Sequence, residues 1–289
     1  MDYFEPKTVS EALAVLEKHG AEAKVIAGGT DVMVDIKYKE EPGCLVNIKK
    51  LPGLSAIQEN GGSLRIGPLV TIHEIESSAL AREKLSVLWE ACHQFASLQI
   101  RNTATIGGNI CRASPSGETL APLLVLEAKA KIAFSDGEKT EPFASFFQGP
   151  GKSSVGSKGL LTGIDVPYPA PSSRGVYLKH AVRGAMDIAM VGVAVLVTPD
   201  AGKNGLQDVR IGLGAVAPTP IRATKTEGLL RGKPLTAALV KEAAAMAAAE
   251  SSPISDQRSS AENRRWIVEA LTRRGLQQSW QAATGKEVA

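Results

Sequence analysis

Cysteine and paired metal ligands are scarce in this sequence. Its three cysteines, Cys44, Cys92 and Cys111, lie far apart, and no two of them form a CxxC pair. Because the number is odd and the spacing is wide, the chain offers neither a disulfide framework nor a zinc site. The four histidines form no HxxxH or HExxH pattern. We therefore expect no metal ion bound by this chain alone.

Long apolar runs and a concentration of one charge are also missing. No apolar segment approaches the roughly 20 residues that a membrane-spanning helix needs, so we expect no membrane span. Residues 1–11 (MDYFEPKTVSE) are polar and acidic and lack the basic and apolar regions of a secretory signal, which favours a cytoplasmic location. The net charge of +3 is dispersed along the chain. It forms no basic stripe of the kind that binds nucleic acid.

A recognisable set of catalytic residues is absent too. A GxGxxA pattern at residues 212–217 resembles a dinucleotide fingerprint, but Pro218 and Pro220 prevent the helix that this fingerprint must open. The GKS at residues 151–153 ends like a P-loop, yet Phe146 stands where that loop needs its first glycine. Since no acid–base pair or activated nucleophile emerges, any chemistry belongs to a bound cofactor.

Two glycine-rich segments are the most informative features present, AGGTD at residues 27–31 and TIGGN at residues 105–109. Each follows or lies within a strand-like apolar stretch. Glycine lets the backbone approach another molecule closely, and successive N–H groups in such a turn form a nest for anions such as phosphate. Neither loop carries Lys or Arg, so any phosphates bound there would be held by backbone dipoles and hydroxyls. Two such loops far apart in the sequence suit a ligand with two phosphates, such as a dinucleotide. Each loop alone is also consistent with a simple tight turn.

Helix and strand signals alternate in the first part of the chain. Thr8 with Glu11, and Thr71 with Glu74, form capping boxes that predict helices at these points. Gly20 is placed to end the first of these helices. Residues 32–38 are compatible with a helix or a strand. Further helices are expected at residues 85–97 and 121–128, and strands at residues 23–28, 44–51, 62–72, 130–134 and 159–169.

A stretch rich in proline and serine, residues 168–175 (YPAPSSRG), is the best candidate for a linker. Three strands and then two helices are expected beyond it. Runs of strands followed by helices favour an α+β fold over a doubly wound parallel sheet. A chain of 289 residues is long for one domain, and we expect about two. The strands are expected at residues 175–182, 188–199 and 206–217, and the helices at residues 235–250 and 260–278.

Together these segments resemble the FAD-binding medium subunit of the molybdenum hydroxylases, the family that includes carbon monoxide dehydrogenase and xanthine dehydrogenase. The resemblance runs nearly from end to end, and it rests on the order and spacing of the segments as well as on the two loops. The segments that carry it are KVIAGGTDVMVDIK, QIRNTATIGGNICRASPSGETLAPLLVLEA, LLTGIDVPYP, LKHAVRGAMDIAMVGVAV, VRIGLGAVAPTPIRA and SPISDQRSSAENRR.

The resemblance implies an FAD-binding fold of the vanillyl-alcohol-oxidase (PCMH) type at residues 1–170, with subdomains at 1–56 and 57–170. A C-terminal α+β domain would follow at residues 175–289. It further implies an oxidoreductase flavoprotein subunit that acts only with partner subunits, in a heterohexamer. A molybdopterin-binding large subunit and a 2Fe-2S small subunit would supply electrons to FAD. NAD, a quinone or oxygen would accept them.

Position by position, the resemblance assigns most cofactor contacts to the two loops. Glu118 stands where the family often has Asp, and Phe95 stands where a family aromatic packs near the cofactor. Leu161 and Lys179 match further cofactor-contacting positions, and a cation at position 179 would favour the anionic reduced flavin. The loop positions that match are Ala27, Gly28, Gly29, Thr30 and Asp31 in the first, and Thr105, Gly107, Gly108 and Asn109 in the second.

Other interpretations of the same residues stay open. In the alternative, the chain is an interaction subunit that keeps the fold as a scaffold and holds no flavin, or holds a different nucleotide. Glu118 and Phe95 leave room for it, because Phe95 is also compatible with a core position in the preceding helix. A free-standing flavin oxidase is disfavoured because no acid or base for a substrate is present. Asp187 and Ile188 lie on a loop that resembles one passing near the flavin. The three scattered cysteines exclude the additional iron–sulfur cluster that one branch of the family carries.

Overall fold

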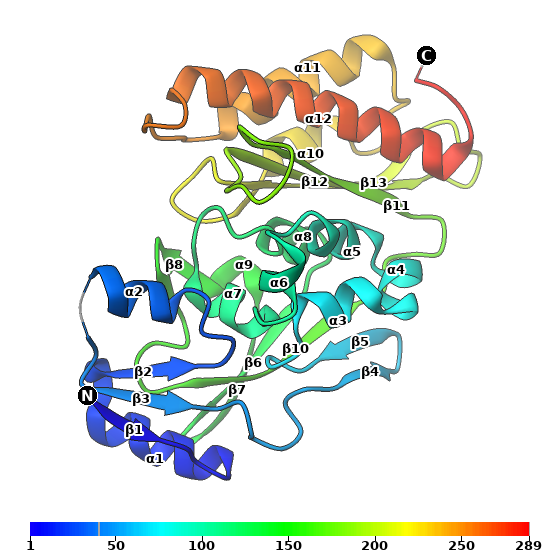
Figure 1. Cartoon of the computed structure of the whole chain (residues 1–289). Helices are drawn as coiled ribbons and strands as arrows, with labels where there is room; N and C mark the ends of the chain where they lie inside the picture. The colour runs from blue at the N-terminus through cyan, green and yellow to red at the C-terminus, as the bar shows by residue number, and fades with distance from the viewer. Residues whose placement is uncertain (40, 289) are drawn as a thin grey trace. The chain divides into compact units, whose positions relative to one another are not determined.

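The computed structural model describes residues 1–39 and 41–288, and these residues form two compact units. Figure 1 shows the helices and strands along the chain. Because the chain leaves and re-enters each unit, neither unit is one continuous segment. The expected domain bounds, 1–170 and 175–289, stay a prediction. Unit 1 comprises Met1–Ser77, Ser97–Ser114 and Glu127–Pro167, and unit 2 comprises Ser78–Ala96, Pro115–Leu126 and the segment from Tyr168 onward.

Unit 1 begins with a small parallel sheet. In sheet order its strands are β1 (Asp2–Phe4), β3 (Cys44–Asn47) and β2 (Ala23–Ile26), and β3 runs parallel to both neighbours. Strand β3 is the central one, and Cys44, Leu45 and Val46 are all buried. The first glycine loop follows directly from β2, so this sheet sets the position from which the loop leaves.

Helix α1 (Val9–His19) forms where its capping box predicts it. The Thr8 hydroxyl accepts a hydrogen bond from the N–H of Glu11 at 3.1 Å, and Gly20 ends the helix with a φ of 54°. A short 3-10 helix, Gly20–Glu22, then leads into β2. Apolar residues at helical spacing face the core beside the small sheet. They are Ala12, Leu13 and Leu16.

A five-stranded antiparallel sheet forms the rest of the framework of unit 1. Along β5, buried Leu64 and Ile66 alternate with Ser63 and Arg65, which is the period of a strand with one face in the core. In sheet order the strands are β4 (Ile57–Asn60), β5 (Ser63–Ile66), β10 (Leu160–Pro167), β6 (Lys129–Phe134) and β7 (Gly137–Pro142). Between β7 and β10 the chain forms α9 (Phe143–Phe146), β8 (Phe147–Gly149) and β9 (Lys152–Ser153).

The second glycine segment is not strand-like, so that expectation was wrong. Residues Ile106–Arg112 form helix α7, and Thr105 is its N-cap. The Thr105 hydroxyl accepts a hydrogen bond from the N–H of Gly108 at 3.0 Å. This cap satisfies a donor of the first helical turn, which outweighs the strand preference of the neighbouring Thr and Ile side chains. Gly107 and Gly108 therefore lie in the first turn of a helix.

The remaining helices of unit 1 follow the sequence more closely. The Thr71–Glu74 capping box is complete, because the N–H of Thr71 donates to the Glu74 carboxylate at 2.6 Å and the N–H of Glu74 donates to the Thr71 hydroxyl at 3.1 Å. Residues 32–38, which the sequence left open between helix and strand, are helical. These helices are α2 (Val32–Tyr38), α3 (Ile72–Ser77) and α6 (Leu98–Arg101).

Unit 2 is built on a four-stranded antiparallel sheet. Helices α10 and α12 cover one face of this sheet, and α5 and α8 cover the other (Figure 1). Strand β12 is buried along almost its whole length for this reason, and it reads as a continuous apolar run instead of alternating. In sheet order the strands are β11 (Arg174–His180), β12 (Val191–Pro199), β13 (Leu206–Gly214) and β14 (Ile221–Arg222).

The helices of unit 2 come from three separate parts of the chain. Together with the sheets they confirm the expected mixture of helix and sheet, while the vanillyl-alcohol-oxidase type of fold stays a prediction. The helices are α4 (Ala79–Lys84), α5 (Ser86–His93), α8 (Leu120–Val125), α10 (Thr224–Leu230), α11 (Ala237–Glu250) and α12 (Ala261–Thr284).

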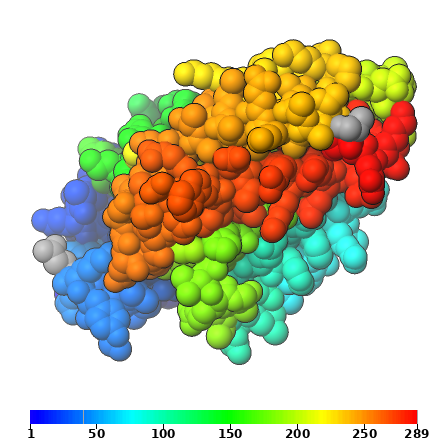
Figure 2. Space-filling view, turned by 90° about the horizontal axis from the view of Figure 1, so that it is seen from above, coloured from blue at the N-terminus to red at the C-terminus, as the bar shows by residue number. Residues whose placement is uncertain are grey.

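Helix α12 lies along α11 on the surface of unit 2, where Figure 2 shows it in orange to red. Ser260 caps its first turn and Gly285 ends it with a φ of 74°. Gly275 lets the helix approach the sheet closely, since a Cβ atom there would fall 2.7 Å from Cγ2 of Val195. Among the helices of the described residues, none combines the length and apolar character needed to cross a membrane.

Candidate cofactor-binding site

The first glycine loop lies against the segment that leads into the second. A Cβ atom at Gly28 would fall 2.1 Å from the carbonyl oxygen of Thr103 and 3.1 Å from Cα of Ala104. Both of these neighbours are backbone, so a side chain at position 28 has no room. Thr103 and Ala104 directly precede Thr105, the N-cap of α7. The fold of unit 1 thus brings together two loops that lie far apart in the sequence.

The backbone N–H groups of the two loops differ in whether they already donate a hydrogen bond within the chain. In the described part of the chain, the N–H groups of Gly28, Gly29 and Thr30 donate no hydrogen bond. Gly29 has a φ of 78°, a left-handed conformation that glycine adopts without strain. These three residues are half-buried. Successive unbonded N–H groups in this conformation are suited to an anion, as the sequence predicts for this loop.

In the second loop the N–H groups of residues 106–109 are all bonded, which corrects the expectation of two equivalent nests. Each N–H from residue 106 to residue 109 already has an acceptor inside unit 1, because these residues form the first turn of α7. The N–H of Ile106 donates to Val70 O, that of Gly107 to Pro68 O, that of Gly108 to the Thr105 hydroxyl, and that of Asn109 to Thr105 O.

The two glycines of the second loop have different roles. A Cβ atom at Gly107 would lie 2.5 Å from Cβ and 2.6 Å from O of Pro68, so Gly107 is needed for packing inside unit 1. Gly108 is exposed, and a Cβ atom there would meet only the Thr105 hydroxyl, at 3.0 Å. Gly108 is therefore the glycine that a bound molecule can approach closely, beside the half-buried side chain of Asn109.

Asp31 ends the first loop and carries the loop's negative charge. Its side chain is exposed, and its carboxylate lies 4.0 Å from the guanidinium Nε of Arg112, at the end of α7. This arginine offsets the repulsion that Asp31 would exert on a phosphate. The donor set of unit 1 thus fits a phosphate-bearing ligand: three free N–H groups, an open glycine and a balanced carboxylate.

Leu161 is the remaining candidate in unit 1, and its side chain is buried. It lies in β10, where the register against β6 shifts between Leu161 and Gly163. Such a bulge bends the strand and re-aims the residues beside it. Thr162, at the shift, donates its hydroxyl proton to Lys131 O at 3.2 Å. Contact between Leu161 and a cofactor stays a prediction.

The other three candidates, Phe95, Glu118 and Lys179, lie in unit 2. Nζ of Lys179 lies 2.9 Å from a carboxylate oxygen of Glu118, and both side chains are nearly buried, with exposed fractions of 8% and 11%. The ammonium also donates to Asp187 O at 2.7 Å and to Gln94 O at 3.4 Å. Its three protons thus have three acceptors in the chain.

This arrangement defines what Lys179 does inside unit 2. The ammonium joins the end of α5, the carboxylate of Glu118 and the loop that holds Asp187. The Asp187 carboxylate in turn accepts hydrogen bonds from the N–H groups of Arg183 and Ile188, both at 2.9 Å. Phe95 follows Gln94 directly and is buried. The fold therefore gathers these candidates, and their contact with a cofactor stays a prediction.

Helix α5 supports the strand that carries Lys179 through polar side chains that the sequence analysis missed. The Glu90 carboxylate accepts a 2.6 Å hydrogen bond from the N–H of Tyr177, and the Gln94 amide donates to Tyr177 O at 3.1 Å. Ser86 donates to Gly175 O at 3.3 Å. Strand β11 is at the edge of its sheet, and these side chains satisfy groups that a neighbouring strand would otherwise bond.

A signal for this contact is present in the sequence. Ser86, Glu90 and Gln94 are spaced four residues apart, which places three polar side chains on one face of a helix that is otherwise largely apolar. Burial raises the pKa of the Glu90 carboxyl, although the hydrogen bond from Tyr177 acts in the opposite direction. Burial and the nearby charge of Glu118 raise the pKa of Tyr177 far above its ordinary value.

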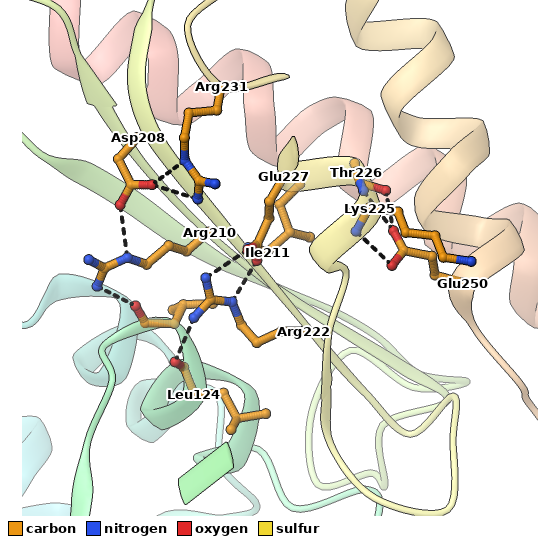
Figure 3. A network of polar contacts seen from close by, with 11 residues as sticks. Leu124, Asp208, Arg210, Ile211, Arg222, Lys225, Thr226, Glu227, Arg231 and Glu250 are labelled. Carbon is orange, nitrogen blue, oxygen red and sulfur yellow. Dashed lines mark hydrogen bonds and ion pairs between the residues drawn. The ribbon is translucent and has the colours of Figure 1, made fainter. Parts of the chain in front are cut away.

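Two arginines fix the far end of α8, the helix that starts two residues after Glu118 (Figure 3). Arg210 donates to Val125 O at 3.2 Å, and Arg222 donates to Leu124 O at 3.3 Å. These carbonyls belong to the last turn of α8, where intrahelical partners run out. Glu227, which is buried, holds Arg222 in place by accepting a 2.8 Å hydrogen bond from it.

The GxGxxA pattern at residues 212–217 has a structural explanation. A Cβ atom at Gly212 would fall 2.7 Å from Ala121 O, so this glycine allows α8 to pack directly on β13. A Cβ atom at Gly214 would come within 3.8 Å of Cβ of Ala121. The pattern does not open a helix, because the chain continues into β14 (Ile221–Arg222), as Pro218 and Pro220 indicated. Gly212 therefore serves the packing of α8, and the pattern forms no dinucleotide fingerprint.

Comparison with known proteins matches both parts of the chain. Residues 1–169 match the family described as FAD binding domain in molybdopterin dehydrogenase, and residues 176–279 match the family described as CO dehydrogenase flavoprotein C-terminal domain. The first match contains both glycine loops, which places the free N–H groups of Gly28, Gly29 and Thr30 inside an FAD-binding domain.

Individual relatives match over almost their full length. The chain is 30% identical to a putative xanthine dehydrogenase FAD-binding subunit of Escherichia coli, over 98% of this chain and 97% of the relative. It is 31% identical to the carbon monoxide dehydrogenase medium chain of Hydrogenophaga pseudoflava, over 96% of each.

The fold agrees with these sequence matches. A solved chain of carbon monoxide dehydrogenase from Hydrogenophaga pseudoflava superimposes with a TM-score of 0.94 at 31% identity, over 98% of both chains. The relatives are oxidoreductase flavoprotein subunits that work within complexes. This chain therefore belongs to the family of FAD-binding medium subunits of the molybdenum hydroxylases, and its cofactor is FAD.

Proposed function

We propose that this chain transfers electrons within a heteromeric molybdenum hydroxylase. A molybdopterin-binding large subunit would oxidise the substrate, a 2Fe-2S small subunit would carry the electrons to FAD, and NAD, a quinone or oxygen would accept them. The observation that carries the proposal is the row of free N–H groups at Gly28, Gly29 and Thr30 beside the second glycine loop. These groups lie within the segment that matches an FAD-binding domain.

FAD supplies the redox chemistry when bound, since a flavin exchanges electrons singly or in pairs. The work of this chain is binding and orientation. The N–H groups of the first loop would hold the diphosphate, and Gly108 would let the cofactor approach α7. Asn109, which directly follows Gly108, would offer its polar side chain to the cofactor. In unit 2, Glu118 and Lys179 would act as a paired, almost neutral charge set rather than as an isolated cation.

A visible absorption spectrum of the purified full-length chain tests the flavin role first. We expect a yellow protein that releases FAD on heating, identified by chromatography and mass. Apoprotein prepared by removing FAD should regain the flavin spectrum when FAD is added. A colourless chain that takes up no FAD and gains no melting temperature from it would support the flavin-free scaffold instead.

Gly108→Val tests whether the second loop faces the cofactor. We expect this variant to fold and to lose FAD, because the added side chain projects into the open surface at Gly108. Gly228→Val is the matched control, since Gly228 is also an exposed helical glycine and a Cβ atom there would meet no neighbour within 4 Å. Normal flavin content in Gly108→Val would show that the second loop does not face the cofactor.

The proposed partners call for a separate measurement. We expect the chain, purified under native conditions from its own cells, to be accompanied by one subunit containing molybdenum and one containing iron and sulfide. Reduction of the flavin in this complex, but not in the isolated chain, should follow addition of the substrate that the large subunit oxidises. A chain that is found alone at native abundance would contradict the proposed electron path.

A further inference from the structure

Helix α2 follows the first glycine loop and is held by very little core packing. It spans Val32–Tyr38, and none of these residues, all of which are described, is buried. Met33, Val34 and Tyr38 are exposed, with exposed fractions of 54%, 52% and 71%. A seven-residue helix is not stable by itself in water. Another interaction must therefore fix its position, and with it the position of the loop that precedes it.

An ion pair with α7 supplies that interaction. The guanidinium of Arg112 donates to both carboxylate oxygens of Asp35, at 2.6 Å and 3.3 Å. Asp35 lies in the middle of α2, and Arg112 is the last residue of α7. Such a two-point contact between arginine and a carboxylate fixes orientation as well as distance. The pair thus links the two helices that follow the two glycine loops.

The surroundings of the pair strengthen it. The Asp35 side chain is only 18% exposed, and that of Arg112 is 33% exposed. Lys39, the residue that caps α2 at its C-terminal end, donates to the same carboxylate at 2.6 Å. Hydrogen bonds from Lys39 and Arg112 hold the pKa of Asp35 below its ordinary value. Asp35 is therefore ionised at neutral pH, and its contact with Arg112 is a full ion pair.

We propose that Arg112 and Asp35 form a tether that holds the first glycine loop in a fixed position relative to the second. By fixing α2 against α7, the tether keeps the N–H groups of Gly28, Gly29 and Thr30 in the arrangement that a diphosphate requires. Arg112 and Asp35 are positioning residues, since they act on the ligand through the loops. The identity of the ligand as FAD rests on the proposed function, whereas the mechanical role of the tether does not.

A double-mutant cycle measures the effect of the tether on FAD binding. Arg112→Gln, Asp35→Asn and the double variant are made in the full-length chain, and the FAD dissociation constant of each apoprotein is measured by flavin fluorescence. If the arranged loop falls to a tenth of the population, the dissociation constant rises about tenfold. We expect this rise in each single variant. Asp35→Asn should add no further rise in the Arg112→Gln background, because Arg112→Gln already breaks the contact with Asp35 together with the longer one with Asp31.

Lys39→Gln is the matched control. This lysine also pairs with Asp35, but it lies on the same helix and is 63% exposed, so its removal leaves the link between α2 and α7 intact. We expect its dissociation constant to stay within about twofold of that of the unmodified chain. The proposal of a tether would be overturned if the effects of Arg112→Gln and Asp35→Asn on the FAD dissociation constant were additive. It would also be overturned if Lys39→Gln raised the dissociation constant as much as they do.

Hydrogen exchange of the apoprotein separates the tether from the proposed function. In Arg112→Gln the N–H groups of Met33 and Asp35, which donate to Gly29 O and Asp31 O, should exchange faster. Those of α1 should not change. Faster exchange in a chain that binds no FAD would support the tether while rejecting the flavin role. Unchanged exchange in a chain that binds FAD normally would reject the tether alone.

Discussion

Nζ of Lys179 lies 2.9 Å from a carboxylate oxygen of Glu118, in a part of unit 2 where both side chains are nearly buried. A charge pair in such a place loses its hydration, and it is tolerated because the remaining protons of the ammonium also find acceptors. Asp187 O and Gln94 O are those acceptors. One lysine thereby holds together a helix end, a carboxylate and a surface loop.

Removing the Lys179 cation alone should therefore lower the free energy of unfolding far more than removing both charges of the Lys179–Glu118 pair. We expect Lys179→Met to lower the free energy of unfolding by about 3–5 kcal/mol, because it removes the ammonium that pairs with the nearly buried Glu118 carboxylate. The double variant with Glu118→Leu should recover most of this loss. Urea unfolding of the apoproteins at neutral pH makes the comparison. A double variant no more stable than the single one would show that the charge of Glu118 is not the cause.

Glu90 should make the stability of the chain depend on pH. Burial raises the pKa of Glu90 in the folded chain above its ordinary value of 4.5. The protonated carboxyl therefore favours folding below the ordinary value, and this contribution is lost as the pH rises through the folded pKa. Glu90→Gln, which keeps an acceptor for the N–H of Tyr177, should remove the effect.

The expected result is a stability difference that grows with pH. Unfolding free energies of Glu90→Gln and the unmodified chain should be similar near pH 4.5, and the variant should become the more stable one as the pH rises to 8. Urea titrations across this interval provide the measurement. Parallel stability curves for the two proteins would mean that Glu90 titrates normally in the folded chain.

Two glycines of unit 2 should respond oppositely to the same substitution. Gly212→Ala places a Cβ atom 2.7 Å from Ala121 O, and we expect a loss of about 1–3 kcal/mol from overpacking of α8 on β13. Gly228→Ala adds a methyl group to an exposed position in α10. Alanine is favoured over glycine there by up to about 1 kcal/mol. Melting temperatures that shift in the same direction for both variants would contradict the packing role of Gly212.

The two loops of unit 1 should also tolerate substitution differently. Gly28→Ala would press a Cβ atom against the backbone at Thr103, so we expect a loss of about 3 kcal/mol or more, or an insoluble chain. In Gly108→Ala the added Cβ atom meets only the Thr105 hydroxyl. The free energy of unfolding of this variant should stay within about 1 kcal/mol of that of the unmodified chain. Thermal unfolding without FAD tests both. Equal stability of the two variants would mean that Gly28 does not pack on Thr103.

The local elements could be predicted because their signals are local. The capping boxes at Thr8 and Thr71 state where α1 and α3 begin, since each cap bonds a residue three positions away. The same local reasoning failed at the second glycine segment. There, side chains that favour a strand compete with the N-cap of a helix, in which the Thr105 hydroxyl accepts a hydrogen bond from the N–H of Gly108. The pattern of side chains does not specify whether a strand or a helix forms.

The candidate site was predictable in composition but not in detail. The glycine loops were found because consecutive glycines beside threonine are compatible with close backbone approach and because their order and spacing match the family. Which N–H groups are bonded was not visible, because the acceptors of the Ile106 and Gly107 N–H groups, Val70 O and Pro68 O, come from a distant segment. The contact of Glu90 with Tyr177 was missed for the same reason, although its spacing with Ser86 and Gln94 was present.

By itself, the sequence determined the helices with strong caps, the mixed helix and sheet composition and the positions of the two glycine-rich segments. These depend on residues within one or two turns of each other. Only the tertiary structure decided that Gly28 packs on Thr103, that the N–H groups of residues 106–109 are bonded while those of Gly28, Gly29 and Thr30 are not, and that Arg112 reaches Asp35. Such contacts join residues far apart in the chain, and their energies depend on distances that no local pattern specifies.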